Sequence, residues 1–270
     1  MEDFFLNYAF MQRALLMGIL TGLTCGMIGV FVVLLRMSFM GMCISHAAFA
    51  GALVSIWLGV PALFGGFAGG VGAAAIVGPF SDRLRVSADT VVGVIFSVMM
   101  SLSMLILGML PSARSEGLNF MWGNLLTATE IDVWLMVACA IGLVALVSLF
   151  FKEIQAMISQ KQAAIASGVP AQGLYYATLL LMGLIIAVTL KAVGGVLIYA
   201  LIVTPAATAI QQTYRLKTLF WLSAFWGVFA SVLGLYLSYW FDMPTGAAIV
   251  LTATMFLVLS RIFARKHQGN

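Results

Sequence analysis

Charged residues are rare along this chain, and they divide it into long intervals of apolar and small residues. A helix that crosses a bilayer needs about 20 consecutive apolar residues. Each interval is close to or above this length, and the second is long enough for two helices. The pattern therefore predicts about nine membrane-spanning helices, with eight as the lower alternative. The intervals are residues 14–35, 37–81, 90–113, 133–151, 162–190, 192–214, 218–241 and 243–260.

The interval 37–81 needs a break between its two predicted helices. Gly59-Val60-Pro61 offers one and Gly65-Gly66 another, because Gly and Pro often interrupt regular structure. The length of the intervals favours helices over a membrane β-barrel, whose strands are about 10 residues long and alternate in polarity. The expected fold class is an all-α polytopic membrane protein with a single transmembrane domain over residues 1–270.

Composition supports this assignment, since 63% of the residues are hydrophobic and only 8% are charged, whereas soluble domains are about 25% charged. Cys25, Cys43 and Cys139 all fall inside predicted spans, so a disulfide framework is not expected. The first residues, Met1-Glu2-Asp3, lack the basic region of a cleavable signal.

The basic residues are unevenly distributed between the two sides that nine crossings would create. If Arg36 is cytoplasmic, ten basic residues fall on that side, against Arg13, Arg114 and Lys191 outside. This bias is typical of cytoplasmic loops, and it predicts an external N-terminus and a cytoplasmic C-terminus. The ten residues are Arg36, Arg83, Arg85, Lys152, Lys161, Arg215, Lys217, Arg261, Arg265 and Lys266.

Several kinds of enzyme motif are missing from the sequence. It has no GxxxxGK[ST] phosphate loop, no HExxH, no GxSxG and no pair of carboxylates inside a predicted span. Intramembrane catalysis would need such a constellation. The sequence therefore favours a transport or structural role, and any ATP hydrolysis would fall to a separate subunit.

The longest predicted cytoplasmic connection is residues 151–173. Its middle, Gln160 to Gly168, is rich in alanine, a strong helix former, and Gly168-Val169-Pro170 should end a helix there. Ala164 and Gly168 are four residues apart and would share one face. This short helix either docks into a groove of a cytoplasmic partner or lies on the surface and ties two spans together.

A series of short motifs follows the predicted spans in a definite order. The most specific is KAVGGVL at 191–197 with ALIVTPAATA at 200–209. The others are GMIGVFVV at 26–33 with RMS at 36–38, GMCISHAAFAG at 41–51, DTVVGV at 89–94, WGNLL at 122–126, and SY at 238–239 with DMPTG at 242–246. Together they cover nearly the whole chain and resemble the ABC-transporter permeases for the divalent metals zinc, manganese and iron.

The resemblance implies a permease in the bacterial cytoplasmic (inner) membrane, working as a homodimer or heterodimer with the translocation path between the two copies. It implies two cytoplasmic ATP-binding subunits, an extracytoplasmic metal-binding protein, surrounding membrane lipid and no nucleic-acid partner. No permanently bound cofactor is implied, because the metal ion is cargo and ATP is bound by the partner subunit.

The resemblance also assigns a coupling helix around residues 155–170, in which Ala164 and Gly168 would contact the ATPase. Gln160-Lys161-Gln162 precedes this Ala, where the family usually carries acidic residues.

The histidine at position 46 raises the question of metal binding. The family places an Asp four residues before this His, and here that position is Met42. His46 could be a transit ligand paired with a second copy, or could bond a carbonyl or water within a helix contact. In a third interpretation Met42 or Cys43 joins His46, which would favour zinc or copper(I) over manganese.

Two further positions are candidate functional sites, and each also has a purely structural interpretation. Thr204-Pro205 should break a helix in mid-membrane, as a gate or as a packing kink. Asp242, near an outer span end, either helps to form an outer vestibule or caps the helix that follows, with Pro244 just inside its start.

The sequence as a whole favours the permease subunit of an ATP-driven importer that moves divalent metal, zinc or manganese, by alternating access. The alternatives are a permease for a metal chelate of the siderophore or cobalamin kind, and a stand-alone secondary transporter. A secondary transporter would carry ionisable coupling residues and inverted repeats, which the sequence does not display.

Overall fold

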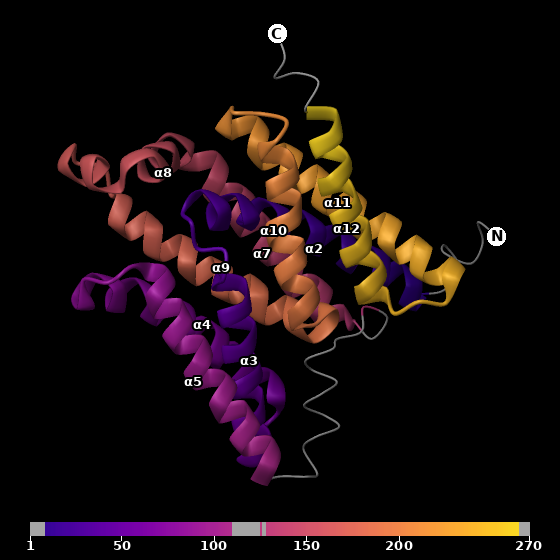
Figure 1. Cartoon of the computed structure of the whole chain (residues 1–270). Helices are drawn as coiled ribbons and strands as arrows, with labels where there is room; N and C mark the ends of the chain where they lie inside the picture. The colour runs from indigo at the N-terminus through magenta and orange to yellow at the C-terminus, as the bar shows by residue number, and fades with distance from the viewer. Residues whose placement is uncertain (1–8, 110–124, 126–127, 265–270) are drawn as a thin grey trace.

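The computed structural model describes residues 9–109, 125 and 128–264, and within these residues it is a bundle of ten α-helices without a strand (Figure 1). The motif at 122–126 lies outside the described residues except for Leu125, which is buried. The helices are α2 (Ala9–Leu34), α3 (Met40–Trp57), α4 (Ala62–Leu84), α5 (Ala88–Met109), α7 (Glu130–Leu149), α8 (Phe151–Ala166), α9 (Ala171–Val193), α10 (Gly195–Ile210), α11 (Leu216–Phe241) and α12 (Thr245–Ala264).

Every predicted span corresponds to a helix. Eight of the described helices are long and apolar enough to cross a membrane. The ninth predicted span corresponds to α10, which has 16 residues and is about 24 Å long at 1.5 Å per residue, against about 30 Å for the hydrocarbon core. The expectation of nine spans, or eight, is confirmed with α10 as the short member.

The break predicted inside 37–81 lies at its first candidate position. Trp57 ends α3 and Ala62 begins α4, and between them Gly59 has a φ of +72°, which glycine adopts readily. The second candidate, Gly65-Gly66, lies inside α4. A tight turn therefore returns the chain so that α4 packs along α3.

The centre of the bundle is α2, which is the most deeply buried of the long helices and contacts α7, α10 and α11. A second group, α3 with α4 and α5, forms one arm of the bundle, and α9 lies between this arm and the rest (Figure 1). One large apolar core includes residues of both groups.

Glycines let several helices touch backbone to backbone. A methyl group at Gly51 of α3 would lie 2.1 Å from the carbonyl oxygen of Gly65 in α4, and one at Gly22 of α2 would lie 2.5 Å from that of Gly227 in α11. Lipid provides no hydrophobic drive for helices to associate, so such close approach supplies the packing instead. Gly22, Gly51, Gly65 and Gly227 are therefore packing positions.

Contacts between the connections gather the predicted cytoplasmic basic residues at one end of the bundle. Helix α8 reaches the end of α4, where Lys161 Nζ lies 4.0 Å from Asp82 Oδ1. At the turn after α2, Tyr175 donates a hydrogen bond to Met37 Sδ (3.6 Å). The turn between α10 and α11 borders α8 as well. We call this the basic end; it carries Arg36, Arg83, Arg85, Lys152, Lys161, Arg215, Lys217 and Arg261.

Replacing Gly51 with alanine tests the backbone contact between α3 and α4. The added methyl group would force the two helices apart, and we expect a loss of about 1–3 kcal/mol in unfolding free energy, the usual cost of overpacking. The measurement is thermal unfolding of the purified protein in detergent.

The matched control is Gly72→Ala in α4, where an added methyl group meets no atom of the described chain within 4 Å. This variant should unfold at or slightly above the wild-type temperature, because alanine favours a helix more than glycine does. Equal effects of the two substitutions would contradict the packing explanation.

Candidate functional site

Met42 and His46 share the one partly exposed face of the first half of α3. They are four residues apart and therefore lie one above the other on the helix. Cys43 is fully buried in the main core, and Ser45 is buried with its hydroxyl donating to the Gly41 carbonyl (2.7 Å). A thioether and an imidazole are thus presented together, and the thiol of Cys43 lies on the core side.

The His46 ring is held from one side by an aromatic side chain of α5. It lies edge-on to Phe96, with ring centroids 5.0 Å apart and planes at 86°. Phe39 contacts the Phe96 ring in a similar way. The Nδ1 atom of His46 is buried and has no hydrogen-bond partner among the described residues. A buried polar atom without a partner is costly, so a cation, a water or a second chain is needed to complete the site.

The start of α10 lies directly beside this part of α3. Gly194 has a φ of +85° and separates α9 from α10 by a single residue. A methyl group at Gly195 would lie 3.3 Å from Ser45 Cβ, and one at Gly41 would meet Ile202 at 3.1 Å. The uncharged intervals divide these two helices at Lys191, and the structure has the break three residues later, at Gly194.

One chain supplies few metal ligands here. Among the residues that the structure describes, no three His, Cys, Asp or Glu side chains come together in a way that could hold a metal ion. Imidazole suits zinc and iron, a thioether suits softer cations, and carboxylates suit manganese. His46, with Met42 beside it, can therefore form only part of a metal site.

Helix α10 continues through Pro205, so Thr204-Pro205 does not end a helix, and its role as a gate or a packing kink stays a prediction. Pro205 cannot donate to the carbonyl four residues earlier. The Thr204 hydroxyl donates to Ala200 O (2.6 Å), and Thr208 donates to Thr204 O (2.8 Å). Threonine side chains thus take part in the backbone bonding around the proline, which the membrane interior requires. The real interruption is ten residues earlier, at Gly194.

The prediction that Asp242 caps the helix after it is wrong. Asp242 instead ends α11, in a left-handed conformation with a φ of +53°, and the Met243 N–H donates to Ser238 O (3.1 Å). Helix α12 begins after Pro244. The Asp242 carboxylate is exposed at the end of the bundle opposite the basic end, and its role in an outer vestibule stays a prediction.

The predicted cytoplasmic helix is the second half of α8. Helix α8 is divided at Gln160, whose φ of −155° and ψ of +91° are not helical. Its second half ends as predicted at Gly168, with a φ of +82° and the Val169 N–H bonded to Ala164 O (3.0 Å). This pairing is a Schellman motif, for which glycine is the usual residue.

Ala164 and Gly168 do not form one exposed edge, contrary to expectation. Ala164 is buried in the main core, because the short helix lies flat on the bundle with this side inward, whereas Gly168 is exposed. The exposed side of this half of α8 is formed by Gln162, Ala163, Ile165 and Ala166.

Asp82 ties α8 to two spanning helices, a connection that the sequence analysis missed. Its carboxylate accepts hydrogen bonds from Tyr176 Oη (2.6 Å) and Gln172 Nε2 (2.5 Å) of α9. Lys161 lies 4.0 Å from this carboxylate and 4.0 Å from the centre of the Tyr175 ring. Burial lowers the pKa of Lys161, and the Asp82 carboxylate offsets part of this shift. The sequence did contain one indication of this connection, because Asp82 is a single acidic residue at the end of a predicted apolar span.

Comparison with known proteins identifies the family to which this chain is similar. Residues 7–264 match the profile of the "ABC 3 transport family". The "Manganese transport system membrane protein MntC" of Listeria monocytogenes is 33% identical over 97% of this chain and 93% of its own length. "Manganese import system permease protein ScaB" of Streptococcus gordonii is 31% identical over 97% and 94%.

Solved structures agree with the sequence matches. The structure "PsaBC from Streptococcus pneumoniae in complex with Fab" superposes with a TM-score of 0.82, at 32% identity over 96% of this chain and 93% of that one. A "putative metal-chelate type ABC transporter" in an inward-facing conformation shares the fold alone, with a TM-score of 0.74 at 14% identity. The chain therefore belongs to the ABC 3 transport family, the metal ABC-transporter permeases that its ordered motifs resemble.

Proposed function

We propose that this chain is the permease subunit of an ATP-driven importer that carries a divalent metal, manganese or zinc, into the cell by alternating access. The observation that carries the proposal is the partly exposed face of α3 on which His46 lies one turn from Met42, with the buried Nδ1 of His46 unpartnered in the described chain. An ionisable group inside a spanning helix is by default functional. Manganese is the first cation to test, because the matched relatives from Listeria and Streptococcus are named for it.

Two copies of the chain would complete the metal site. A symmetric dimer, with the α3 faces turned toward a common path, would supply two imidazoles with a thioether beside each. Such a site is weak, and weak binding suits a permease, since the ion must leave as easily as it enters. Met42 in place of a carboxylate makes the donor set softer, which favours zinc relative to manganese.

The basic end would face the cytoplasm, following the distribution of positive charge in membrane proteins. The ATP-binding subunits would then dock on the exposed side of α8. Asp242 would lie outside, where its charge can attract cations near the metal-binding protein that delivers the cargo. The Asp82 contacts would carry movements of α8 to α4 and α9.

Replacing His46 with alanine should reduce metal uptake to the level of membranes without the transporter, because the site would lose its one nitrogen ligand per chain. The measurement is uptake of radioactive manganese and zinc by proteoliposomes that contain the assembled transporter. The matched variant is Met42→Leu, which keeps the size of the side chain but removes the thioether; it should retain manganese uptake while its preference for zinc falls. Wild-type uptake by a folded His46→Ala transporter would exclude the ligand role.

Replacing Met42 with aspartate should shift the preference from zinc toward manganese. The carboxylate would lie on the same face as His46, one helical turn away, and oxygen donors suit manganese. Competition of zinc against labelled manganese uptake measures the shift. An unchanged ratio of the two inhibition curves would indicate that Met42 faces away from the path.

Replacing Lys161 with glutamine tests the link between α8 and the spanning helices. We expect the ATPase activity of the assembled transporter to persist while the metal transported per ATP falls, because α8 loses its charged contact with Asp82. The matched control is Lys152→Gln, an exposed lysine in the first half of α8, which should leave this ratio unchanged. A parallel loss of ATPase activity and transport in Lys161→Gln would mean that the lysine serves assembly and does not serve coupling.

A further inference from the structure

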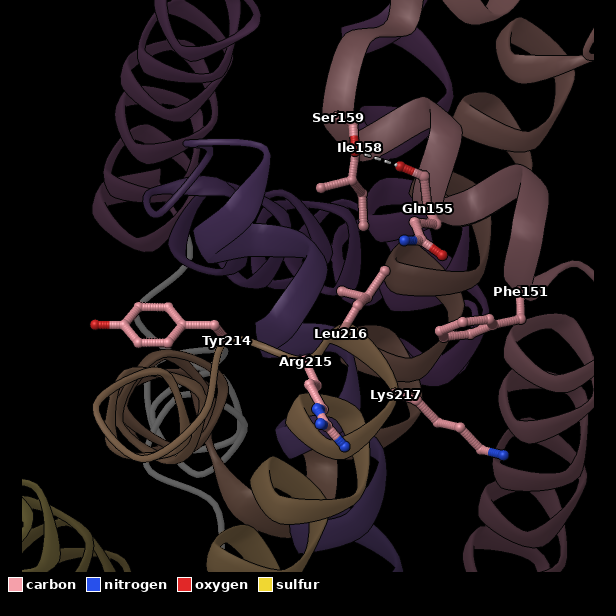
Figure 2. A pocket seen from close by; sticks show the side chains of 8 residues that line it. All are labelled: Phe151, Gln155, Ile158, Ser159, Tyr214, Arg215, Leu216 and Lys217. Atoms are coloured by element: carbon pink, nitrogen blue, oxygen red, sulfur yellow. Dashed lines mark hydrogen bonds between the residues drawn. The ribbon is translucent and has the colours of Figure 1, made fainter.

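Two adjoining cavities lie at the basic end, between α7, α8 and the start of α11. The first, of about 410 Å³, has a mixed lining: the polar and basic side chains of Gln155, Ser159, Arg215 and Lys217, and the apolar or aromatic side chains of Phe151, Ile158, Tyr214 and Leu216 (Figure 2). The second, of about 490 Å³, is lined mainly by apolar side chains. Phe151 and Lys217 border both cavities, so they form one continuous groove, which we call the interfacial groove.

The polarity of the interfacial groove changes along α11. Lys217 lies in the first turn of this helix, and Phe220 and Trp221 lie about one turn deeper, facing Val147 of α7 across the second cavity. Figure 2 shows the Lys217 side chain extended away from α11. A ligand with a charged group at the basic end and an apolar part below it would match this gradient.

The groove exists because α7 and α11 both pack on α2. Phe220 forms part of its floor, fully buried and in contact with Phe31 of α2, with ring centroids 5.0 Å apart. Trp221, which lines the second cavity, is 52% exposed. Large exposed apolar side chains on spanning helices face lipid, and tryptophan is enriched at the level of the head groups. The groove therefore lies at the lipid-facing surface.

The positive charges of the groove are not neutralised within the described chain. Neither Arg215 nor Lys217 forms an ion pair with another described residue, and both side chains are exposed. Basic pockets between spanning helices are suited to anionic lipid head groups. The unpaired positive charges and the apolar cavity below them together favour a ligand with an anionic head group and an apolar chain.

We propose that the interfacial groove binds an anionic phospholipid, with its phosphate at Lys217 and Arg215 and an acyl chain between α7 and α11. A lipid wedged there would fill the gap between helices that do not pack on each other, and would hold the start of α11 relative to α8. The site is separate from His46, so the proposal stands independently of the metal.

The test is thermal unfolding of the purified full-length chain in a neutral detergent, titrated with phosphatidylglycerol, with phosphatidylcholine or with inorganic phosphate. Phosphatidylglycerol should raise the unfolding temperature at lower concentration than phosphatidylcholine, and inorganic phosphate should have no effect. In Lys217→Gln the apparent affinity for phosphatidylglycerol should fall about fivefold, the equivalent of about 1 kcal/mol. The exposed Arg261→Gln, at the same end but outside the groove, should behave like wild type.

Three outcomes would overturn the proposal. Equal effects of the two lipids would show that the head-group charge is not recognised, and an effect of phosphate alone would indicate a site for free anions. The third outcome concerns the ATP-binding subunits. If Lys217→Gln binds phosphatidylglycerol like wild type but fails to assemble with those subunits, the groove is a protein-docking surface.

Discussion

Close contact between helix backbones is the interaction on which this structure depends. In a bilayer the apolar faces of helices are already solvated by lipid, so association must come from packing at short range. Gly51 against Gly65 fixes α4 to α3, and Gly22 against Gly227 fixes α11 to α2. These two contacts set the positions of the helix that carries His46 and of the helix that forms one wall of the interfacial groove.

The same constraint explains why polar chemistry is so sparse and so localised. Hydroxyl groups inside the bundle are mostly used up on backbone carbonyls one turn earlier, as Ser45, Thr178 and Thr252 illustrate. Four buried side-chain atoms have no partner in the described chain: Thr21 Oγ1, His46 Nδ1, Gln211 Oε1 and Ser231 Oγ. Of these four residues His46 alone is ionisable, and an ionisable group inside a spanning helix is by default a functional hypothesis.

Sequence reasoning succeeded where a local signal determines the structure. Long uncharged intervals predicted the spans, and Gly59 and Gly168 end helices where their positive φ angles are needed. It failed where a residue could serve either of two neighbours. Asp242 could cap the helix after it but ends the helix before it, and Pro205 could end a helix but lies within one.

The sequence pattern also could not predict how the helices pack against one another. The spacing of Ala164 and Gly168 predicted a shared face, but it could not reveal that Ala164 packs inward. The partly exposed face of Met42 and His46 and the contact with Phe96 depend on how α5 lies against α3. The motifs identified the family, and the structure was needed to find which atoms of the site lack partners.

The single residue between α9 and α10 has a mechanical consequence. Helix α9 has 23 residues and is about 35 Å long; it begins beside the Asp82 contacts and ends at Gly194, where α10 starts against Ser45. Because no loop separates α9 from α10, a tilt of α9 at the basic end would also move the start of α10, which borders His46. Helix α9 therefore joins the Asp82 contacts at one end of the bundle to the helix start beside Ser45 and His46.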